Sequence, residues 1–373
     1  ALTPKLLHAS TWFSVFLDDY PHAVCNDGSP AAYYYRPGEP SQRQWFVFLE
    51  GAGWCWDVKS CSLSWHMRLG TSVEFPRTPL AVHNWANNLE GIFEMSKSPL
   101  RDLNIAYIRT CSNDAFMGDT GPRENEGHTP GLGWHFRGRR IIDATFEDLR
   151  TKRGLGRDGD RVIYGGCSSG ARGAMVSLDY VATHLVGRAT VRGLLDSGLW
   201  VPIHPRANGL VSFNLQTENA FQLMRPPPEF LDRECLGEHI GDAWKCLEGA
   251  FRFPYVRTPF FLTHSQYDLF AISMNVFGHF LPSAKLDAAQ KRYADTYRTL
   301  VVKYLPTPVM GSGTTIYSSA CYAHCTLTSK AMYVLRADGV TLSDALNRWF
   351  TAADAHTATR WIRDRCGGFD CGR

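Results

Sequence analysis

The stretch 161–175 holds the residues best suited to chemistry. An apolar run meets the small residues Gly166-Cys167-Ser168-Ser169-Gly170, and a predicted helix follows. This fits G-x-S-x-G, a strand-to-helix turn so sharp that its middle serine is strained and only small neighbours two positions away fit. Ser168 has glycine at both positions and Ser169 does not. The pattern favours Ser168 as a nucleophile; the alternative is a glycine-rich turn without chemistry.

A serine hydroxyl needs a histidine to take its proton and a carboxylate to orient that histidine. In the α/β-hydrolase fold these residues follow in the order serine, acid, histidine, with the acid after a late strand and the histidine after the last one. Asp268 follows a predicted strand at 258–263, and His324 follows one at 313–317. We therefore expect Ser168, Asp268 and His324 to form a catalytic triad.

Other residues compete for these roles. Asp196 also ends a strand and is the alternative acid, although it comes one strand earlier than the order requires. His264 precedes the acid, His279 has no strand end nearby, and His128 falls in a loop rich in Gly, Pro and Glu. For His324 itself, the alternative is a structural histidine held between cysteines.

A second glycine-rich turn, 50–56, follows a predicted buried strand. In α/β-hydrolases a loop at this place gives a backbone N–H to the oxyanion hole, and glycines let such amides approach an anion. Gly53 and Trp54 are the candidate donors, together with Ser169, whose N–H follows the nucleophile. The alternative is a plain turn that ends the strand.

Aromatic side chains accompany this turn. Trp54, Trp56 and Trp65 are close in sequence, and they either line a pocket for an acyl group or a sugar or pack the loop. Trp56 and Phe116 are the candidate substrate contacts.

Strands and helices alternate on both sides of the sharp turn at 166–170, called the elbow from here on, as a doubly wound parallel sheet requires. We expect one α/β-hydrolase domain over 1–373, with long disulfide-stapled loops. Residues 66–100 and 119–133 are expected to be loops, and 208–246 an insertion that caps or walls the site. Strands are predicted at 31–36, 44–49, 104–110, 162–164, 190–195, 258–263 and, last, 313–317, and helices at 136–153, 171–185, 288–304 and 340–365.

The composition fits an ordinary globular enzyme. The 373 residues are 44% hydrophobic and carry a net charge of +3, with no Lys/Arg block that would suggest nucleic acid. No apolar run approaches the roughly 20 residues of a membrane span. The first residues lack the long apolar core of a signal peptide, and the sequence starts at Ala, so we expect a processed mature chain. We also expect it to be a monomer.

Eleven cysteines favour a secreted or lumenal protein. The short spacings 55/61, 235/246 and 366/371 suit local disulfide loops. They do not suit zinc, because no C-x-x-C occurs and Cys321/Cys325 with His324 lacks a second pair. An odd count leaves one thiol, and we expect it to be Cys167, packed inside the elbow as a small core residue.

The chain resembles the pectin acetylesterase / Notum family of serine carboxylester hydrolases. The similarity lies in separated short stretches that together reach most of the chain. They are LEGAGWCW (49–56), DAFMGD (114–119), FRGRR (136–140), GCSSG (166–170), Tyr267-Asp268 with Ile272, and SACYAHC (319–325).

This resemblance implies the same triad and an oxyanion hole formed by the N–H groups of Gly53, Trp54 and Ser169. It also implies Cys25–Cys111 and Cys55–Cys61 disulfides; the six other cysteines besides Cys167 allow fifteen pairings. Two departures stand out: Ala52 replaces a usual Gly, and Ser169-Gly170-Ala171 replaces Ala-Gly-Gly. Both are small changes that should preserve the elbow.

The expected function is the hydrolysis of a carboxylic ester through an acyl-enzyme, with no metal or cofactor. The substrate is expected to carry a short, acetyl-like acyl group on an extracellular ester such as a polysaccharide. One alternative is a long-chain deacylase acting on a lipid ester or a lipidated protein. Another is a catalytically silent binding protein on the same fold.

Overall fold

The computed structural model describes residues 11–39, 41–122, 133–281 and 285–369, so His128 and Cys371 lie outside the described residues. The strands are β1 (Phe13–Phe16), β2 (Ala32–Arg36), β3 (Gln44–Leu49), β4 (Asn104–Ile108), β5 (Arg161–Cys167), β6 (Thr190–Asp196), β7 (Phe260–Thr263), β8 (Tyr267–Asp268), β9 (Thr315–Ser318), β10 (Tyr322–Ala323), β11 (Arg336–Ala337), β12 (Val340–Thr341) and β13 (Arg360–Arg363).

The α-helices are α2 (Val58–His66), α3 (Pro79–Ala86), α5 (Gly138–Arg153), α6 (Ser169–Tyr180), α7 (Phe213–Met224), α8 (Arg233–Glu238), α9 (Gly249–Arg252), α10 (Leu269–Phe277), α11 (Ala288–Tyr304), α12 (Ala331–Val334), α13 (Leu342–Thr351) and α14 (Ala355–Ala358). Short 3-10 turns are η1 (Gly91–Phe93), η3 (Pro228–Phe230), η4 (Ala243–Leu247), η5 (Phe253–Tyr255) and η6 (Thr326–Thr328), and η2 (Val181–Leu185) is a π-helix.

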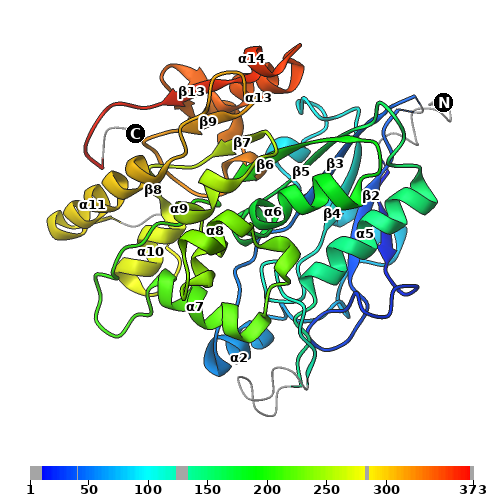
Figure 1. Ribbon diagram of the computed structural model, residues 1–373, viewed down its shortest axis with the longest axis horizontal. Helices are drawn as coiled ribbons and strands as arrows, with labels where there is room; N and C mark the ends of the chain where they lie inside the picture. The colour runs from blue at the N-terminus through cyan, green and yellow to red at the C-terminus, as the bar shows by residue number, and fades with distance from the viewer. Residues whose placement is uncertain (1–10, 40, 123–132, 282–284, 370–373) are drawn as a thin grey trace.

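Over the described residues, nine strands form one sheet in the order β1-β2-β4-β3-β5-β6-β7-β9-β13. β2 is antiparallel to both of its neighbours, and every other pairing in this sheet is parallel. Figure 1 shows α5 and α6 lying across one face of this sheet. The loops after the parallel strands therefore meet at the edge formed by the carboxyl ends of the strands. This edge is where α/β sheets bind their ligands.

The strands are apolar because helices cover both faces of the sheet. Along β3, Trp45, Val47 and Leu49 belong to the core that includes α5, α6 and α11. Phe46 and Phe48 alternate with them and belong to the core that includes α3 and α13. A strand buried on both faces shows a continuous apolar run, which is why β3 was predictable to the residue.

The C-terminal part differs from its prediction. A single helix over 340–365 is wrong: α13 ends at Thr351, α14 is one turn, and β13 then pairs in parallel with β9. Asp354 starts the new turn, since its carboxylate accepts a hydrogen bond from the N–H of Thr357. The strand at 313–317 is therefore not the last one in the sheet.

The predicted loop 66–100 is also wrong in part, because it contains α3. Thr78 caps this helix and Pro79 opens its first turn, a combination that favours helix starts. The helices predicted at 136–153, 171–185 and 288–304 are confirmed by α5, α6 and α11.

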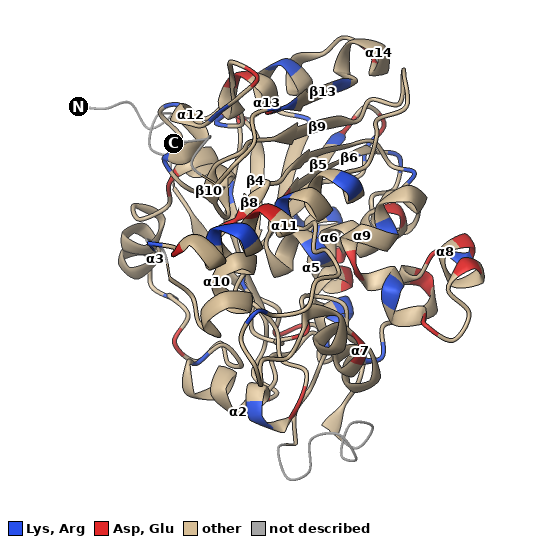
Figure 2. Ribbon diagram, turned by 90° about the vertical axis from the view of Figure 1, so that its left-hand side faces the viewer, with Lys and Arg blue, Asp and Glu red and all other residues tan. Residues whose placement is uncertain are grey.

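Lys and Arg are interspersed with Asp and Glu over the ribbon (Figure 2). Among the described residues, no helix combines the length and apolar character needed to cross a bilayer.

Candidate active site

Ser168 stands at the turn between β5 and α6. β5 ends at Cys167 and α6 begins at Ser169, so the direction of the chain changes within one residue. Ser168 has a φ of 56° and a ψ of −123°, and a residue with a side chain adopts a positive φ only when its surroundings impose it. This is the strained backbone that the sequence pattern predicts.

The two glycines of the pattern are required for steric reasons. A Cβ on Gly170 would collide with the backbone oxygen of Leu49, and one on Gly166 would lie 2.6 Å from the backbone carbon of Gly170. The elbow is thus packed directly against the end of β3, where the second glycine-rich turn begins.

Asp268 and His324 are brought together by two short strands. β8 pairs in parallel with β10, and the register sets Ala323 opposite Asp268. Nδ1 of the next residue, His324, lies 2.7 Å from Oδ2 of Asp268. The other carboxylate oxygen accepts a hydrogen bond of 2.8 Å from the N–H of Ala271 at the start of α10. The carboxylate is therefore held from two sides and is buried.

Burial and mutual contact act in opposite directions on this pair. Burial by itself would lower the pKa of His324 and raise that of Asp268, because it disfavours both charged forms. The charge of each partner and their hydrogen bond outweigh burial, so the pKa of His324 is raised and that of Asp268 is lowered. Asp268 stays a carboxylate, and His324 becomes a stronger base.

The end of β6 fixes both the elbow and the segment after His324. The N–H of Cys325 donates to Oγ of Ser197 at 3.0 Å, and the N–H of Leu327 donates to Oδ2 of Asp196 at 2.7 Å. The backbone oxygen of Asp196 accepts a hydrogen bond of 2.8 Å from the N–H of Ser168. Asp196, the alternative acid, therefore binds backbone around the site, while Asp268 binds the imidazole.

The competing histidines lie in other surroundings. His264 is fully buried, and burial lowers its pKa to about 4, so it stays neutral. Its Nε2 lies 3.5 Å from the hydroxyl of Tyr297. His279 is exposed beyond the end of α10.

Cys167 and Cys325 form a disulfide, so the prediction that Cys167 is the leftover thiol is wrong. Successive side chains of a strand point to opposite faces, and Cys167 shares its face of β5 with Ile163, in the core that includes α13. Cys325 packs against the same core from the loop after β10. Among the described residues, Cys321 is the cysteine that keeps its thiol.

Three further pairings agree with the sequence. The structure contains the two disulfides that the family resemblance implies and one of the local loops, namely Cys25–Cys111, Cys55–Cys61 and Cys235–Cys246. Cys366 is also disulfide-bonded.

The turn after β3 meets the start of α6 at Ser169. The N–H groups of Ala52 and Gly53 both donate to Oγ of Ser169, each at 3.1 Å. Gly53 has a φ of +82°, which favours glycine. The N–H of Ser169 is the first of α6 and has no partner within the helix, at the end where the helix dipole is positive.

Arg172 is a buried residue that sequence reasoning missed. Its guanidinium carbon lies 3.9 Å from the ring centre of Trp54 and 4.0 Å from that of Trp200. The two indoles are nearly perpendicular to each other, so the cation packs into the corner between them. It also donates to Oγ1 of Thr217, which donates in turn to Oε1 of Glu248. An arginine in the first turn of the elbow helix is the one signal that the sequence offered.

Aromatic rings continue from this cluster to His324. Trp200 lies 4.6 Å from Phe213 and 6.0 Å from Phe270, measured between ring centres. Phe270 stacks on His324 at 5.3 Å. Trp54, Trp200 and Phe213 are each buried, so aromatic rings fill the space beside the elbow.

The predicted substrate contacts fall in different places. Trp56 is half-buried and lines a pocket of about 260 Å³ between α2, the start of α7 and α10. Phe116 is 1% exposed and packs against the backbones of Gly138 and Gly173 inside the core, which leaves its ring no surface for a ligand. Trp65 packs against Trp134 with the rings tilted and their centres 6.0 Å apart.

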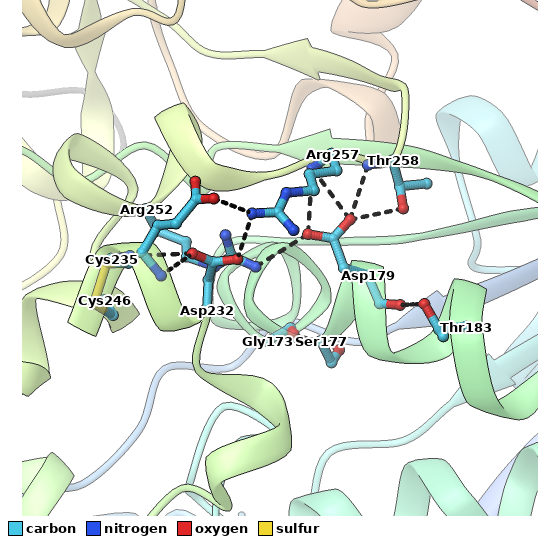
Figure 3. A network of polar contacts seen from close by, with 11 residues as sticks. Gly173, Ser177, Asp179, Thr183, Asp232, Cys235, Cys246, Arg252, Arg257 and Thr258 are labelled. Carbon is cyan, nitrogen blue, oxygen red and sulfur yellow. Dashed lines mark hydrogen bonds and ion pairs between the residues drawn. A yellow bond between two sulfur atoms is a disulfide. The ribbon is translucent and has the colours of Figure 1, made fainter. Parts of the chain in front are cut away.

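The segment 208–246 forms α7, η3 and α8 and packs against α6 through η3. Figure 3 shows the polar network on this side of α6. Asp179 of α6 accepts a hydrogen bond of 2.7 Å from the hydroxyl of Thr258 and pairs with Arg252 at 3.3 Å. Arg257 reaches from this network to Asp232 at 3.5 Å, so it connects α6 to the start of α8.

One group among the described residues gathers three potential metal ligands, Cys167, His324 and Cys325, whose ligand atoms all lie within 4.8 Å of one another. The two sulfurs are bonded to each other, and a disulfide is not the thiolate ligand that metals need. The grouping shows instead that the imidazole lies beside the elbow.

The chain is similar to known proteins over most of its length. A sequence model of the family described as pectinacetylesterase matches residues 10–364. The palmitoleoyl-protein carboxylesterase NOTUM of Drosophila melanogaster is 28% identical over 342 residues, which cover 87% of this chain and 46% of that protein. Pectin acetylesterase 5 of Arabidopsis thaliana is 26% identical over 352 residues, which cover 88% of this chain and 77% of that protein.

The chain thus spans about half the length of the Drosophila relative. A crystal structure of the Wnt deacylase Notum from Drosophila superposes with a TM-score of 0.80 at 25% identity, covering 96% of this chain and 97% of that chain. The match of the family model over nearly the whole chain shows that this protein belongs to the pectinacetylesterase family, a family of carboxylic ester hydrolases with the α/β-hydrolase fold.

Proposed function

We propose that this chain hydrolyses carboxylic esters, with Ser168 as nucleophile, His324 as general base and Asp268 as the residue that orients the imidazole. The observation that carries the proposal is the 2.7 Å hydrogen bond between His324 and Asp268 beside a serine on a strained elbow. A buried histidine–carboxylate pair next to an activated serine is the arrangement that acyl transfer requires.

The reaction proceeds in two halves. Oγ of Ser168 attacks the ester carbonyl as Nε2 of His324 takes its proton, and Asp268 stabilises the resulting imidazolium through Nδ1. The imidazolium then protonates the departing alcohol, which leaves an acyl-serine. Water, activated by the same imidazole, releases the acid and restores the serine. The residues named supply every proton transfer.

The oxyanion hole is formed by the N–H groups of Gly53, Trp54 and Ser169. The N–H of Ser169 is supported by its place at the first position of α6. The N–H of Gly53 donates to Oγ of Ser169 at 3.1 Å, so it would exchange this partner for the oxyanion when substrate binds. Removing one such donor typically lowers kcat about 10²- to 10³-fold.

The preferred substrate carries a short acyl group. Packed rings of Trp54, Trp200, Phe213 and Phe270 occupy the space between the elbow and α10, which favours an acetyl-like group over a long chain. A pectin acetylesterase is among the relatives, so an acetylated polysaccharide is the natural alcohol partner to test.

A second candidate is the removal of a longer acyl chain. The apolar pocket of about 260 Å³ has Phe213 in its wall, on the side that leads to Trp200 and the site. Its other lining residues include Trp56, Leu63 and Met274. It is small beside the roughly 300–1,000 Å³ of typical ligand pockets, which suits a chain of medium length better than a long one.

The chain works outside the cytosol. Four disulfides are present among the described residues, and disulfides persist in oxidising compartments.

Hydrolysis of p-nitrophenyl esters from acetate to myristate tests these candidates, with Ser168→Ala as control. A maximum at acetate or butyrate supports the short-acyl proposal, and a maximum at octanoate or longer supports the second candidate. In the Phe213→Ala variant, a shift of the optimum to longer chains would show that the pocket receives the acyl group. Turnover by Ser168→Ala would overturn the triad.

A further inference from the structure

The Cys167–Cys325 disulfide joins the residue before the nucleophile to the residue after the catalytic histidine. We infer that this bond positions the active site: it holds the His324 imidazole against Ser168, and cleaving it slows acyl transfer while the fold persists. The inference rests on the proposed triad and adds a covalent, redox-sensitive contact to it.

This disulfide lies directly beside the proposed catalytic residues. The two cysteines are 158 residues apart in the chain, yet their Cα atoms lie 5.6 Å apart. Their sulfurs and a ring nitrogen of His324 all lie within 4.8 Å of one another. A displacement of Cys325 is therefore passed directly to the imidazole of the preceding residue.

The backbone around the disulfide is unusual at both ends. Ser168 has a φ of 56° and Cys325 has a φ of 53°. Residues with side chains keep such values only when the surrounding structure imposes them. The disulfide connects these two strained turns, so it restrains the nucleophile and the base relative to each other.

Hydrogen bonds hold the same loop independently. The N–H of Cys325 donates to Ser197, and the N–H of Leu327 donates to the buried carboxylate of Asp196. Asp268 holds the imidazole from the other side. With these contacts in place, loss of the disulfide should loosen the loop without releasing it. We therefore expect kcat to fall because the imidazole is less well positioned.

The bond is also open to reduction from one side. Cys325 is half-buried, whereas Cys167 is buried. A thiolate of a dithiol reductant attacks the sulfur of Cys325 and the thiolate of Cys167 departs. A second thiol of the reductant then closes its own disulfide, which leaves two protein thiols and one oxidised reductant.

The first test compares the double variant Cys167→Ser/Cys325→Ser with the wild type. A displacement near 1 Å can cost about 10²-fold in rate, so we expect kcat for p-nitrophenyl acetate to fall roughly 10- to 100-fold with KM changed little. The matched control is Cys235→Ser/Cys246→Ser, which removes a disulfide within the α8–η4 segment and should keep kcat within about 2-fold. Melting curves fix a temperature at which all three proteins are folded.

A second measurement tests the same inference on the wild-type protein, in case the double variant does not fold. Wild-type protein is treated with graded dithiothreitol and divided. One portion is assayed and then reoxidised, and the other is alkylated so that the reduced cysteines can be identified by mass spectrometry. We expect kcat of the first portion to fall in step with alkylation of Cys325 in the second and to recover on reoxidation, while far-ultraviolet circular dichroism is unchanged.

An unchanged kcat in the folded double variant, or in protein reduced at Cys325, would overturn the inference. A loss of melting temperature alone would assign the bond a purely structural role. Either result leaves the proposed function intact as long as Ser168→Ala is inactive, whereas activity in Ser168→Ala would remove the triad itself.

Discussion

Nδ1 of His324 lies 2.7 Å from Oδ2 of Asp268, although the two residues are 56 positions apart in the chain. The contact follows from the parallel register of β8 and β10, which sets Ala323 beside Asp268. A two-residue strand pairing therefore decides which acid serves the histidine.

Activity should depend on pH through His324. The base must be neutral, and contact with Asp268 raises its pKa above the ordinary value of 6.5. Lowering the pH through the raised pKa protonates the imidazole, so kcat/KM should fall along an acid limb centred above pH 6.5. A profile of kcat/KM from pH 4.5 to 9 with p-nitrophenyl acetate measures it, and a limb centred below the ordinary value would contradict the assignment.

Asp268→Asn should remove the charge that raises the pKa of His324. The acid limb should then move to lower pH, and kcat should fall by about 10⁴-fold, since the amide favours the wrong imidazole tautomer. The same pH profile measures both effects. An acid limb at the same pH as in the wild type would mean that Asp268 does not determine the pKa of the His324 imidazole.

Asp196→Ala separates the two candidate acids. Asp196 accepts a hydrogen bond from the N–H of Leu327, so its loss should loosen the histidine loop and lower kcat by about 10-fold, the effect of one or two hydrogen bonds. Asp268→Ala should cost far more. Comparison of kcat for the two variants is the measurement, and a larger loss in Asp196→Ala would reverse their roles.

Ser169→Ala examines the hydroxyl that accepts from the N–H groups of Ala52 and Gly53. Losing two hydrogen bonds, each worth about 1 kcal/mol, should loosen the turn 50–56, which carries two of the proposed oxyanion donors. We expect kcat to fall with little change in KM. Steady-state kinetics with an acetyl ester, with Ser169→Thr as the hydroxyl-bearing control, tests this. A rise in kcat would instead mean that the hydroxyl competes with the substrate for Gly53.

Arg172→Met should destabilise the protein. Burial lowers the pKa of Arg172 and the Glu248 carboxylate opposes this, so the two groups depend on each other. Removing Arg172 leaves the buried Glu248 without the opposite charge that faces it through Thr217, and a buried group left without its partner costs about 1–3 kcal/mol. Urea unfolding measures the loss, and Arg172→Met/Glu248→Gln should recover much of it. Equal stability of the single and double variants would show that the two charges are not coupled.

Much of the candidate site could be proposed from the sequence because its strand and turn signals are local. Ser168 lies in a steric pattern that only glycine neighbours permit, and β3 and β5 are buried runs that are easy to recognise. The order of serine, acid and histidine then indicated Asp268 and His324 without any contact information.

The rest depended on contacts between distant segments. The partner of Cys167 is 158 residues away, and no spacing rule reaches that far. β13 is a four-residue edge strand with arginine at both ends, so it lacks the apolar run of a central strand. Arg172 became notable only once the rings of Trp54 and Trp200 were both seen against its guanidinium.

The most direct test is covalent labelling with an alkyl fluorophosphonate, followed by peptide mass spectrometry. The triad predicts one adduct, on Ser168, formed at a rate that falls with protonation of His324. It also predicts neither adduct nor turnover in a Ser168→Ala variant that keeps the wild-type melting temperature. An adduct on another residue, or ester hydrolysis by the folded Ser168→Ala variant, would contradict the account.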